Sequence, residues 1–403
     1  MLDDNAVDND TRRRAIPMLP PQSLRGLGAR HGVTAQKGRG AVSNLQGRYE
    51  LDQREIFDDG WEREDGDAEG AMLRRTLVTE EMAKSILSRN QSPDIPFGVS
   101  LNPYRGCEHG CIYCFARPSH SYLGLSPGLD FESRLYAKVN APELLRSELS
   151  KPGYTVEPIA LGVNTDAYQP CEREYGLTRR VLEVLHECNH PVGLITKSSL
   201  IERDIDILAA MAKKGLAAAS ITLTTLDPKI ARTLEPRAAA PERRLRTIRT
   251  LTEAGIPVGV SIAPIIPFVT EPEIEKIMEA ARDAGAIAAS HVVLRLPWEV
   301  NPLFQQWLEA HFPDRAQRVM NRVREMHGGK DYDASFATRM HGSGIWADLI
   351  SQRMEKGIAR FGLGGKGMRF KQLDRTLFRR PLVVPAAGAR AAAAVKAGQL
   401  DLF

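Results

Sequence analysis

Three cysteines lie close together in the chain and could hold a metal centre. Cys107, Cys111 and Cys114 have the spacing CxxxCxxC, directly after a short run typical of a strand. Three thiolates can ligate three irons of a 4Fe–4S cluster and leave the fourth iron open to a small molecule, whereas clusters that only transfer electrons usually have four cysteine ligands. The thiols therefore predict an iron–sulfur cluster with one open, reactive iron.

The residues around the thiols agree with this prediction but leave one alternative open. Glycines would let the backbone pass close to a bulky cluster, and arginines would offset its negative charge. These residues are Gly106, Gly110, Arg105 and Arg117. The alternative is a zinc site of the three cysteines with His109 or His120, because Cys3His is a common ligand set of structural zinc.

The composition limits the class of protein. A chain of 403 residues is long enough for one large barrel domain with extensions. The formal net charge of +4 is small for this length, so charge alone does not indicate a nucleic-acid-binding protein. No apolar run approaches the ~18 residues that span a bilayer, so no membrane association is expected. Five cysteines with three in one array favour a reducing, cytoplasmic compartment, and Cys171 and Cys188 are expected to be ordinary reduced thiols.

From residue 98 onward, apolar strand patterns alternate with amphipathic helix patterns. Strands are expected at residues 99–102, 159–165, 192–196, 218–223, 258–266 and 292–296. Helices are expected at residues 142–149, 178–187, 202–214, 241–254 and 272–284. This alternation is typical of parallel βα units, and it predicts an α/β fold with an incomplete (βα)6 barrel. In such barrels the functional residues lie at the carboxyl ends of the strands.

Polar residues follow two of these strands. Asn164, Thr165 and Asp166 end the second strand and suit hydrogen bonds from an ammonium or from ribose hydroxyls, although an Asx turn would use the same residue types. Lys197 follows the third strand, where its ammonium can pair with a carboxylate or simply remain exposed at the rim.

The fourth unit of the predicted barrel adds two candidates. Thr222 lies on one face of the fourth strand with Ser220 and Thr224, because side chains alternate along a strand. Glu235 lies in the loop before the next helix, where it could hold a ribose or an arginine, or form a loop salt bridge.

The cysteine array, with the aromatic Tyr113 directly before its third cysteine, resembles the signature of the radical S-adenosylmethionine (SAM) superfamily. Over residues 97–296 the chain is most similar to the branch that includes spore photoproduct lyase and its DNA repair photolyase-like relatives. The resemblance implies an incomplete (βα)6 barrel, a 4Fe–4S cluster, SAM, and an electron donor that reduces the cluster. SAM would chelate the open iron, and its cleavage would give a 5′-deoxyadenosyl radical that takes hydrogen from the substrate.

The resemblance also implies roles for the candidate residues. Lys197 would bind the carboxylate of SAM, as a similar lysine does in the lyase. The residues expected around SAM are Tyr113, Asn164, Thr165, Asp166, Lys197, Thr222 and Glu235. Two departures argue against spore photoproduct itself as the substrate. Val163 stands where the lyase has its hydrogen-returning cysteine, and Phe115 stands where it has a tyrosine.

We expect four regions along the chain. Residues 1–90 form a partly irregular N-terminal extension, which includes an acidic run around Trp61 and a predicted helix at residues 79–88. Residues 91–297 form the partial barrel. Residues 298–383 form a helical, basic C-terminal region, with helices predicted at residues 301–311 and 314–326. Residues 384–403 form an alanine-rich linker with a terminal peptide.

The C-terminal region carries two features that point to nucleic acid. Residues 353–380 combine many basic residues with Phe361, Phe370 and Phe378, which suits phosphate contact and base stacking, although a solvated basic tail would look similar. The last residues, QLDLF, resemble the peptide by which bacterial repair proteins bind the DNA sliding clamp. Its anchors would be Gln399, Leu400, Leu402 and Phe403.

Three functions remain open from the sequence. The first is a radical SAM enzyme that acts on nucleic acid, through lesion repair or base modification. The second is a radical SAM enzyme that modifies RNA, protein or a small metabolite. The third is a metal-binding adaptor of the sliding clamp without catalytic activity.

Overall fold

The structure is a computed structural model that describes residues 37–50, 75–365 and 372–381. Several sequence predictions concern residues outside these ranges. They are the acidic run around Trp61, Phe370, the alanine-rich linker, and the terminal peptide with Gln399, Leu400, Leu402 and Phe403. Within the described ranges, no helix is both long and apolar enough to cross a membrane.

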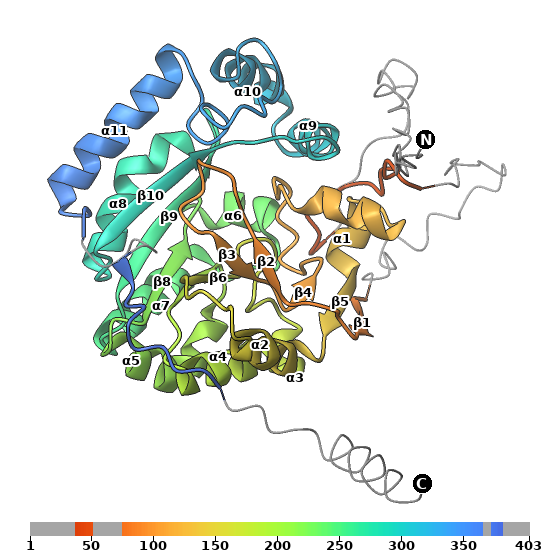
Figure 1. Ribbon diagram of the computed structural model, residues 1–403. Coiled ribbons are helices and arrows are strands. Elements are labelled where there is room, and N and C mark those ends of the chain that lie inside the picture. The colour runs from red at the N-terminus through yellow and green to blue at the C-terminus, as the bar shows by residue number, and fades with distance from the viewer. Residues whose placement is uncertain (1–36, 51–74, 366–371, 382–403) are drawn as a thin grey trace, which may run out of the picture. The chain divides into compact units, whose positions relative to one another are not determined.

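A seven-stranded sheet forms the centre of the fold, in the order β10-β9-β8-β7-β6-β3-β2 (Figure 1). Neighbours from β3 to β10 pair in parallel, and β2 pairs with β3 in the antiparallel direction. The strands are β2 (Leu87–Arg89), β3 (Val99–Leu101), β6 (Ile159–Leu161), β7 (Val192–Thr196), β8 (Ala217–Thr222), β9 (Val258–Ile265) and β10 (Ala288–Val293). In the described part of the chain, β2 and β10 do not pair with each other, so the barrel is open. The predicted α/β fold with an incomplete (βα)6 barrel is confirmed.

Helices connect the parallel strands, and the longer of them cover the outside of the sheet (Figure 1). They are α2 (Ala141–Ser150), α3 (Glu172–Tyr175), α4 (Leu177–Glu187), η4 (Ser199–Asp204), α5 (Ile205–Ala212), α6 (Pro228–Leu234), α7 (Pro241–Glu253), η5 (Glu271–Glu273) and α8 (Ile274–Asp283). In α4, for example, Val181, Leu182 and Leu185 are fully buried, and their spacing places them on one helical face. The five strands from β3 to β9 in this sheet are mostly buried, as expected for parallel strands that have helices on one face and the side chains of the barrel interior on the other, whereas β2 and β10 are partly exposed.

A second, three-stranded sheet lies beside the barrel, in the order β1-β5-β4. It consists of β1 (Leu77–Glu81), β5 (Arg134–Lys138) and β4 (Tyr104–Arg105). The predicted helix at residues 79–88 is wrong, because β1 pairs with β5 and β2 pairs with β3. Pairing with strands distant in sequence outweighs the helix propensity of the acidic residues there.

Helices α9 (Val300–His311) and α10 (Pro313–Met326) confirm the two predicted C-terminal helices, and α11 (Ile345–Phe361) was not predicted. The interpretation of residues 353–380 as a base-stacking surface is wrong where the structure describes it. Phe361 is buried, and Phe378 packs against Tyr154 and His190. Arg353 forms ion pairs with carboxylates that precede and begin α8. These side chains stabilise the packing of α11 and the segment that follows it.

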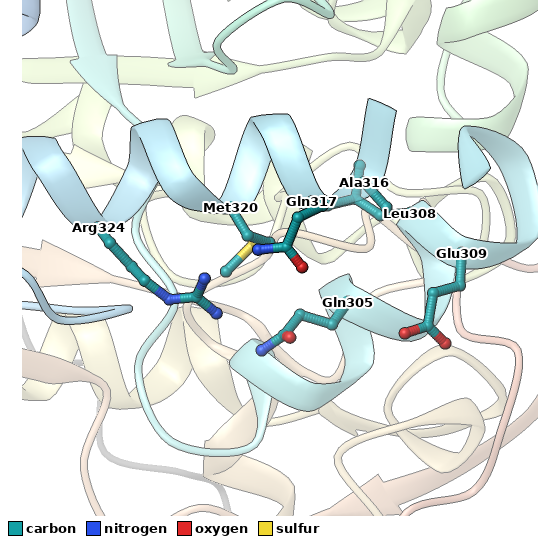
Figure 2. Close-up of a pocket in the computed structure, with 7 residues that line it drawn as sticks. All are labelled: Gln305, Leu308, Glu309, Ala316, Gln317, Met320 and Arg324. Atoms are coloured by element: carbon teal, nitrogen blue, oxygen red, sulfur yellow. The ribbon is translucent and has the colours of Figure 1, made fainter. Parts of the chain in front are cut away.

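A small pocket of about 50 Å³ lies between α9 and α10 (Figure 2). It is lined by Gln305, Leu308, Glu309, Ala316, Gln317, Met320 and Arg324. Such a volume holds only a few water molecules, so this pocket has no room for a cofactor of the size of SAM.

Candidate active site

The three cysteines lie on the thiol loop, residues 106–116, between β4 and the short helix η3 (Arg117–Leu123). All three thiols are free; Cys107 and Cys111 are buried and Cys114 is partly exposed. The loop is fixed to two neighbouring elements by backbone hydrogen bonds. The Cys107 amide donates to the Phe131 carbonyl in α1 (Leu129–Ser133) at 3.0 Å, and the Ile112 amide donates to the Leu234 carbonyl at 3.1 Å. The thiols therefore project from a loop of defined shape.

Arg117 supports the thiol loop through hydrogen bonds to the loop backbone. It is fully buried, and its guanidinium donates to the carbonyls of Cys111 (2.9 Å) and Gly110 (3.0 Å). Its remaining donors bind the carbonyls of Pro127 and Gly128 and the carboxylate of Glu132. A guanidinium has five N–H groups, and all five are engaged here. Arg117 therefore shapes the loop.

Arg105, which we expected to offset the charge of a cluster, points elsewhere. It forms a bidentate ion pair with Glu81 of β1, with distances of 2.7 and 2.8 Å, and almost half of its side chain is exposed. The charge of Arg105 is therefore balanced by Glu81, and the structure does not support the prediction that Arg105 offsets the charge of a cluster.

Residues 37–50, here called the N-terminal strap, pack against the thiol loop. The Gly40 and Ala41 amides donate to the carboxylate of Glu132 at 3.0 and 2.8 Å, and Arg39 donates to the Glu132 carbonyl at 2.7 Å. A side chain at position 40 would place its Cβ 1.9 Å from the Gly110 carbonyl oxygen, so only glycine fits there. Glu132 thus connects the strap to Arg117, and Arg117 in turn binds the thiol loop.

Asp166 links the ends of β6 and β7 to the thiol loop. Its carboxylate accepts hydrogen bonds from the Thr196 hydroxyl at 2.7 Å and the Lys197 amide at 2.8 Å. His109 Nδ1 lies 3.2 Å from Asp166 Oδ2. Burial alone would raise the pKa of Asp166, but His109 and these donors lower it overall, to about 2. Asp166 is therefore an ionised anchor of this turn.

The two residues before Asp166 have different environments. Thr165 is buried, and its hydroxyl donates to the Tyr104 carbonyl at 3.0 Å. Asn164 is exposed, and its backbone N–H donates to Asn102 Oδ1 at 2.9 Å. The structure thus supports a structural turn for Thr165 and leaves the side chain of Asn164 accessible.

A buried polar cluster lies on the other side of the thiol loop. Glu235 accepts hydrogen bonds from the hydroxyls of Tyr113 and Thr224 and pairs with Arg244. Arg244 also donates to the carbonyl of Thr222 at 3.0 Å. Burial alone would raise the pKa of Glu235, but Arg244 and Lys197 lower it to about 2. Of the alternatives for Glu235, the structure shows the pairing with an arginine.

Lys197 lies between these two groups. Its ammonium is 5.9 Å from the centre of the Tyr113 ring, and the side chain is half-buried. Burial alone would lower the pKa of Lys197, but Cys111, Glu235 and Asp166 raise it overall. No hydrogen-bond acceptor for this ammonium is found among the described residues. Lys197 is thus a cation beside the thiol loop that is available to an anionic ligand.

The structure therefore brings together most of the residues expected around SAM. Tyr113, Lys197, Thr222 and Glu235 meet on one side of the thiol loop, and Asp166 meets it through His109. Sequence reasoning missed the supporting residues Asn102, Glu132 and Arg244. Arg244 lies in the basic run ERRLR of α7, which looks like a solvated face, and no feature of the sequence marks it as the buried arginine.

The donor set suits an iron–sulfur cluster better than a single metal ion. Among residues 37–50, 75–365 and 372–381, no three His, Cys, Asp or Glu side chains converge to hold one ion. His120 Nε2 lies 2.8 Å from the Arg134 carbonyl, and His109 lies beside Asp166. A cluster takes one thiolate on each of three irons, so its cysteines need not converge on one point. The three free thiols fit a cluster, and the structure gives the Cys3His zinc alternative no support.

Comparisons with known proteins agree with this site. The family profile of the radical SAM superfamily matches residues 101–281, which contain the thiol loop, Lys197 and Glu235. The uncharacterized protein Rv2578c of Mycobacterium tuberculosis is 30% identical over 289 residues, covering 71% of this chain and 81% of that protein. The uncharacterized protein MJ0683 of Methanocaldococcus jannaschii is 25% identical over 223 residues, covering 55% of this chain and 80% of that protein.

Among solved structures, a spore photoproduct lyase complexed with dinucleoside spore photoproduct has a TM-score of 0.46 and 13% identity, covering 70% of this chain and 79% of that chain. Streptococcus suis SuiB bound to S-adenosylmethionine has a TM-score of 0.30 and 13% identity, covering 50% of this chain and 37% of that chain. The superfamily profile covers the thiol loop and strands β6 to β9, and Rv2578c is 30% identical to this chain over 81% of its own length, so this chain belongs to the radical SAM superfamily of enzymes.

Proposed function

We propose that Cys107, Cys111 and Cys114 hold a 4Fe–4S cluster and that SAM binds beside them. Enzymes of the radical SAM superfamily use both cofactors. When bound, they supply a 5′-deoxyadenosyl radical, because one electron from an external donor cleaves the sulfonium of SAM. The observation that carries this proposal is the position of three free thiols on a braced loop next to an available lysine.

The surrounding residues have separate tasks in this proposal. Lys197 binds the carboxylate of SAM, since its ammonium lacks an acceptor among the described residues. Asp166 is a positioning residue, because it fixes the backbone amide of Lys197 at 2.8 Å. Asn164 offers an exposed amide for a further polar contact, whereas Thr165 supports the turn through the Tyr104 carbonyl.

The buried cluster completes the wall of the site. Glu235 holds the Tyr113 hydroxyl, and Arg244 balances the carboxylate charge and fixes Thr222 through its carbonyl. Glu235 and Arg244 balance each other, so this part of the wall is close to neutral, and Lys197 and Asp166 carry the remaining charges. An anion entering the site therefore meets one cation whose charge is only partly balanced by its neighbours.

The substrate in this proposal is a nucleic acid, modified or repaired by radical chemistry in the cytoplasm. Two observations support this class. Phe115, directly after Cys114, is 47% exposed, and the Arg295 guanidinium lies 5.5 Å from the centre of its ring. Aromatic faces next to arginines bind bases and phosphates. The terminal QLDLF peptide, with its resemblance to sliding-clamp ligands, would bring the enzyme to DNA.

The first experiment tests the cofactors. The protein is reconstituted anaerobically with iron and sulfide, reduced, and given SAM. We expect about four irons per chain and release of 5′-deoxyadenosine, detected by chromatography. Colourless protein that binds zinc and does not cleave SAM would refute the proposal.

The second experiment tests the substrate class. Reduced enzyme and SAM are incubated with ultraviolet-irradiated DNA, undamaged DNA or RNA, and the nucleosides are resolved by mass spectrometry after digestion. A mass change in DNA that requires SAM supports the proposal, whereas a change in RNA alone would favour the second function. Modification of a protein or metabolite in cell extract, with all nucleosides unchanged, would favour the second function instead.

The third experiment tests recruitment. The full chain and a variant that lacks residues 399–403 are compared for binding to a purified bacterial sliding clamp. We expect binding of the full chain and its loss after truncation. Equal binding of both proteins would refute the role of Gln399, Leu400, Leu402 and Phe403.

A further inference from the structure

Exposed aromatic side chains lie in two groups of contacts with arginines, one at the N-terminal strap and one beside the thiol loop. Among the described residues, the large aromatic side chains that are about half exposed or more are Tyr49, Phe115, Tyr122, Trp298 and Phe336. Four of the five lie against an arginine, and the fifth stacks on one of the four. Exposed aromatics are costly to leave in water, so their association with arginines calls for an explanation.

The first group joins the N-terminal strap to the loop before α9. The rings of Tyr49 and Tyr122 stack with their centres 5.1 Å apart. Arg48 lies 5.5 Å from the Tyr49 ring and 4.3 Å from the Trp298 ring. Tyr122, Tyr49, Arg48 and Trp298 therefore form a continuous surface of π faces and one guanidinium.

The second group of contacts lies beside the thiol loop. Arg295, three residues before Trp298, lies 5.5 Å from the ring of Phe115, the neighbour of Cys114. Arg295 Nη1 also lies 3.2 Å from the sulfur of Met340. The adjacent Arg339 lies 4.6 Å from the ring of Phe336. We call the whole set, from Tyr122 to Phe336, the aromatic–arginine strip.

The three arginines of the strip differ in their partners. Arg48 forms an ion pair with Glu299 at 2.7 Å, and Arg339 forms one with Asp94 at 2.7 Å. Arg295 has no carboxylate within ion-pair distance among the described residues, and its buried Nε lacks an acceptor there. Its weak contacts are the Met340 sulfur and the Tyr332 hydroxyl at 3.5 Å. Arg295 is therefore available to bind an anion.

The edge of the sheet next to the strip is closed to a peptide. β10 is an outer strand, but its Val293 amide donates to the Met340 carbonyl and its Ala289 amide to the Leu363 carbonyl, both at 3.0 Å. A peptide that adds a strand needs such groups to be free. The strip offers π faces and a cation in place of backbone partners.

We propose that the aromatic–arginine strip binds a single-stranded segment of nucleic acid and leads it past the thiol loop. Bases stack on Tyr122, Trp298 and Phe115, and Arg295 binds a phosphate. This inference rests on the proposed nucleic-acid substrate and adds the location of the strand and its single-stranded state. Bases in a duplex have their faces covered by neighbouring pairs, so only an unpaired strand can use the strip.

The test measures binding of a fluorescein-labelled, 12-nucleotide DNA by anisotropy, as a single strand and as a duplex. Cluster-loaded full-length protein is used without reductant. We expect tighter binding of the single strand, with affinity about tenfold weaker in Trp298→Ala and in Tyr122→Ala, because each variant loses a stacked base. Arg295→Gln should lower the slope of log affinity against log salt by about 0.7, the value for one phosphate on a single strand.

Matched controls lie outside the strip. Ile345→Ala removes an apolar side chain that is 83% exposed, and Arg146→Gln removes a surface arginine of α2. Both should bind like the wild type. Iron content and thermal unfolding of every variant show whether folding is preserved. A misfolded variant is replaced by Trp298→Leu or Tyr122→Leu, which keep apolar bulk and lose the π face.

The outcomes separate the two proposals. Wild-type protein that binds neither the single strand nor the duplex would overturn the nucleic-acid substrate itself. Single-strand binding that is unchanged in the folded strip variants would overturn only the strip. Tighter binding of the duplex would also overturn the strip and leave the substrate class intact.

Discussion

The two ends of the parallel sheet bury polar side chains in opposite electrostatic states. At the carboxyl end, Asp166 and Glu235 are ionised, with the pKa of each lowered to about 2 by surrounding cations and hydrogen-bond donors. At the amino end, just before β7, His190 is fully buried, and burial lowers its pKa to about 4. The Tyr154 hydroxyl lies 2.7 Å from its Nε2, and Phe378 packs on the ring.

This difference distinguishes a ligand site at the carboxyl end of the sheet from a closed, neutral core at its amino end. Burying ions costs several kcal/mol for each charge unless partners compensate it, so a core without a task for them is more simply built from neutral groups. The amino end follows that rule with a neutral imidazole and aromatic rings. The carboxyl end keeps Lys197, Arg244 and two carboxylates beside the thiol loop, which is consistent with a charged ligand there.

The largest effect is expected from removal of a thiol at the carboxyl end. Cys111→Ala should abolish 5′-deoxyadenosine production and reduce bound iron, because only two cluster ligands remain. Cys188→Ala, which removes a buried free thiol near the amino end, should leave SAM cleavage unchanged. Iron analysis and product chromatography measure both. Full activity of Cys111→Ala would contradict the conclusion that the carboxyl end, and not the amino end, holds the cofactors.

Breaking the buried ion pair should have the next largest effect. Glu235→Leu leaves Arg244 as an uncompensated buried charge, so the free energy of unfolding should fall by about 3–5 kcal/mol. The double variant with Arg244→Met as well should recover much of this loss. Urea unfolding of the three proteins gives the values. A loss below 1 kcal/mol for Glu235→Leu would show that the pair is not buried as described.

The neutral His190 at the amino end should make the free energy of unfolding depend on pH. Because the pKa of His190 is lower in the folded state, the unfolded chain binds more protons between pH 6.5 and 4. The wild type should therefore lose up to about 3 kcal/mol of stability on acidification through this range, relative to His190→Gln. Urea unfolding at pH 7, 5.5 and 4 tests this. Parallel curves for the two proteins would indicate a solvated imidazole.

The smallest effect is expected for an ion pair away from both ends. Arg146 pairs with Glu187 between the outer helices α2 and α4, with both side chains partly exposed. Arg146→Gln should change the unfolding free energy by less than about 1 kcal/mol, because exposed ion pairs are weak. SAM cleavage should not change. A loss comparable to that of Glu235→Leu would contradict the contrast between buried and exposed pairs.

The fold could be predicted because its signals are local. The apolar runs of β7 and β9 and the amphipathic period of α4 are visible in short windows of sequence. The three thiols were visible for the same reason. By contrast, the strands β1 and β2, which replace the helix expected at residues 79–88, depend on pairing with β5 and β3, and no local pattern carries that information.

The support of the site could not be predicted for a related reason. Arg244 and Glu132 are charged residues among other charged residues, and only the assembled fold shows that they are buried. Lys197 was found because it directly follows a strand, where position alone indicates the rim of the barrel. Position along a strand can be read from sequence, whereas the direction of one arginine on a basic helix cannot.

The N-terminal strap has a practical consequence for anyone who shortens this protein. Gly40 and Ala41 bind the same carboxylate that receives Arg117, so the segment and the cysteine-bearing loop share one fastening. Trimming the chain to the borders of the superfamily match, residues 101–281, would discard the strap while keeping every cysteine. The shortened protein would retain its thiols and the Arg117–Glu132 pair but lose the segment that packs against the thiol loop, and weak iron loading of such a fragment would say little about the full-length enzyme.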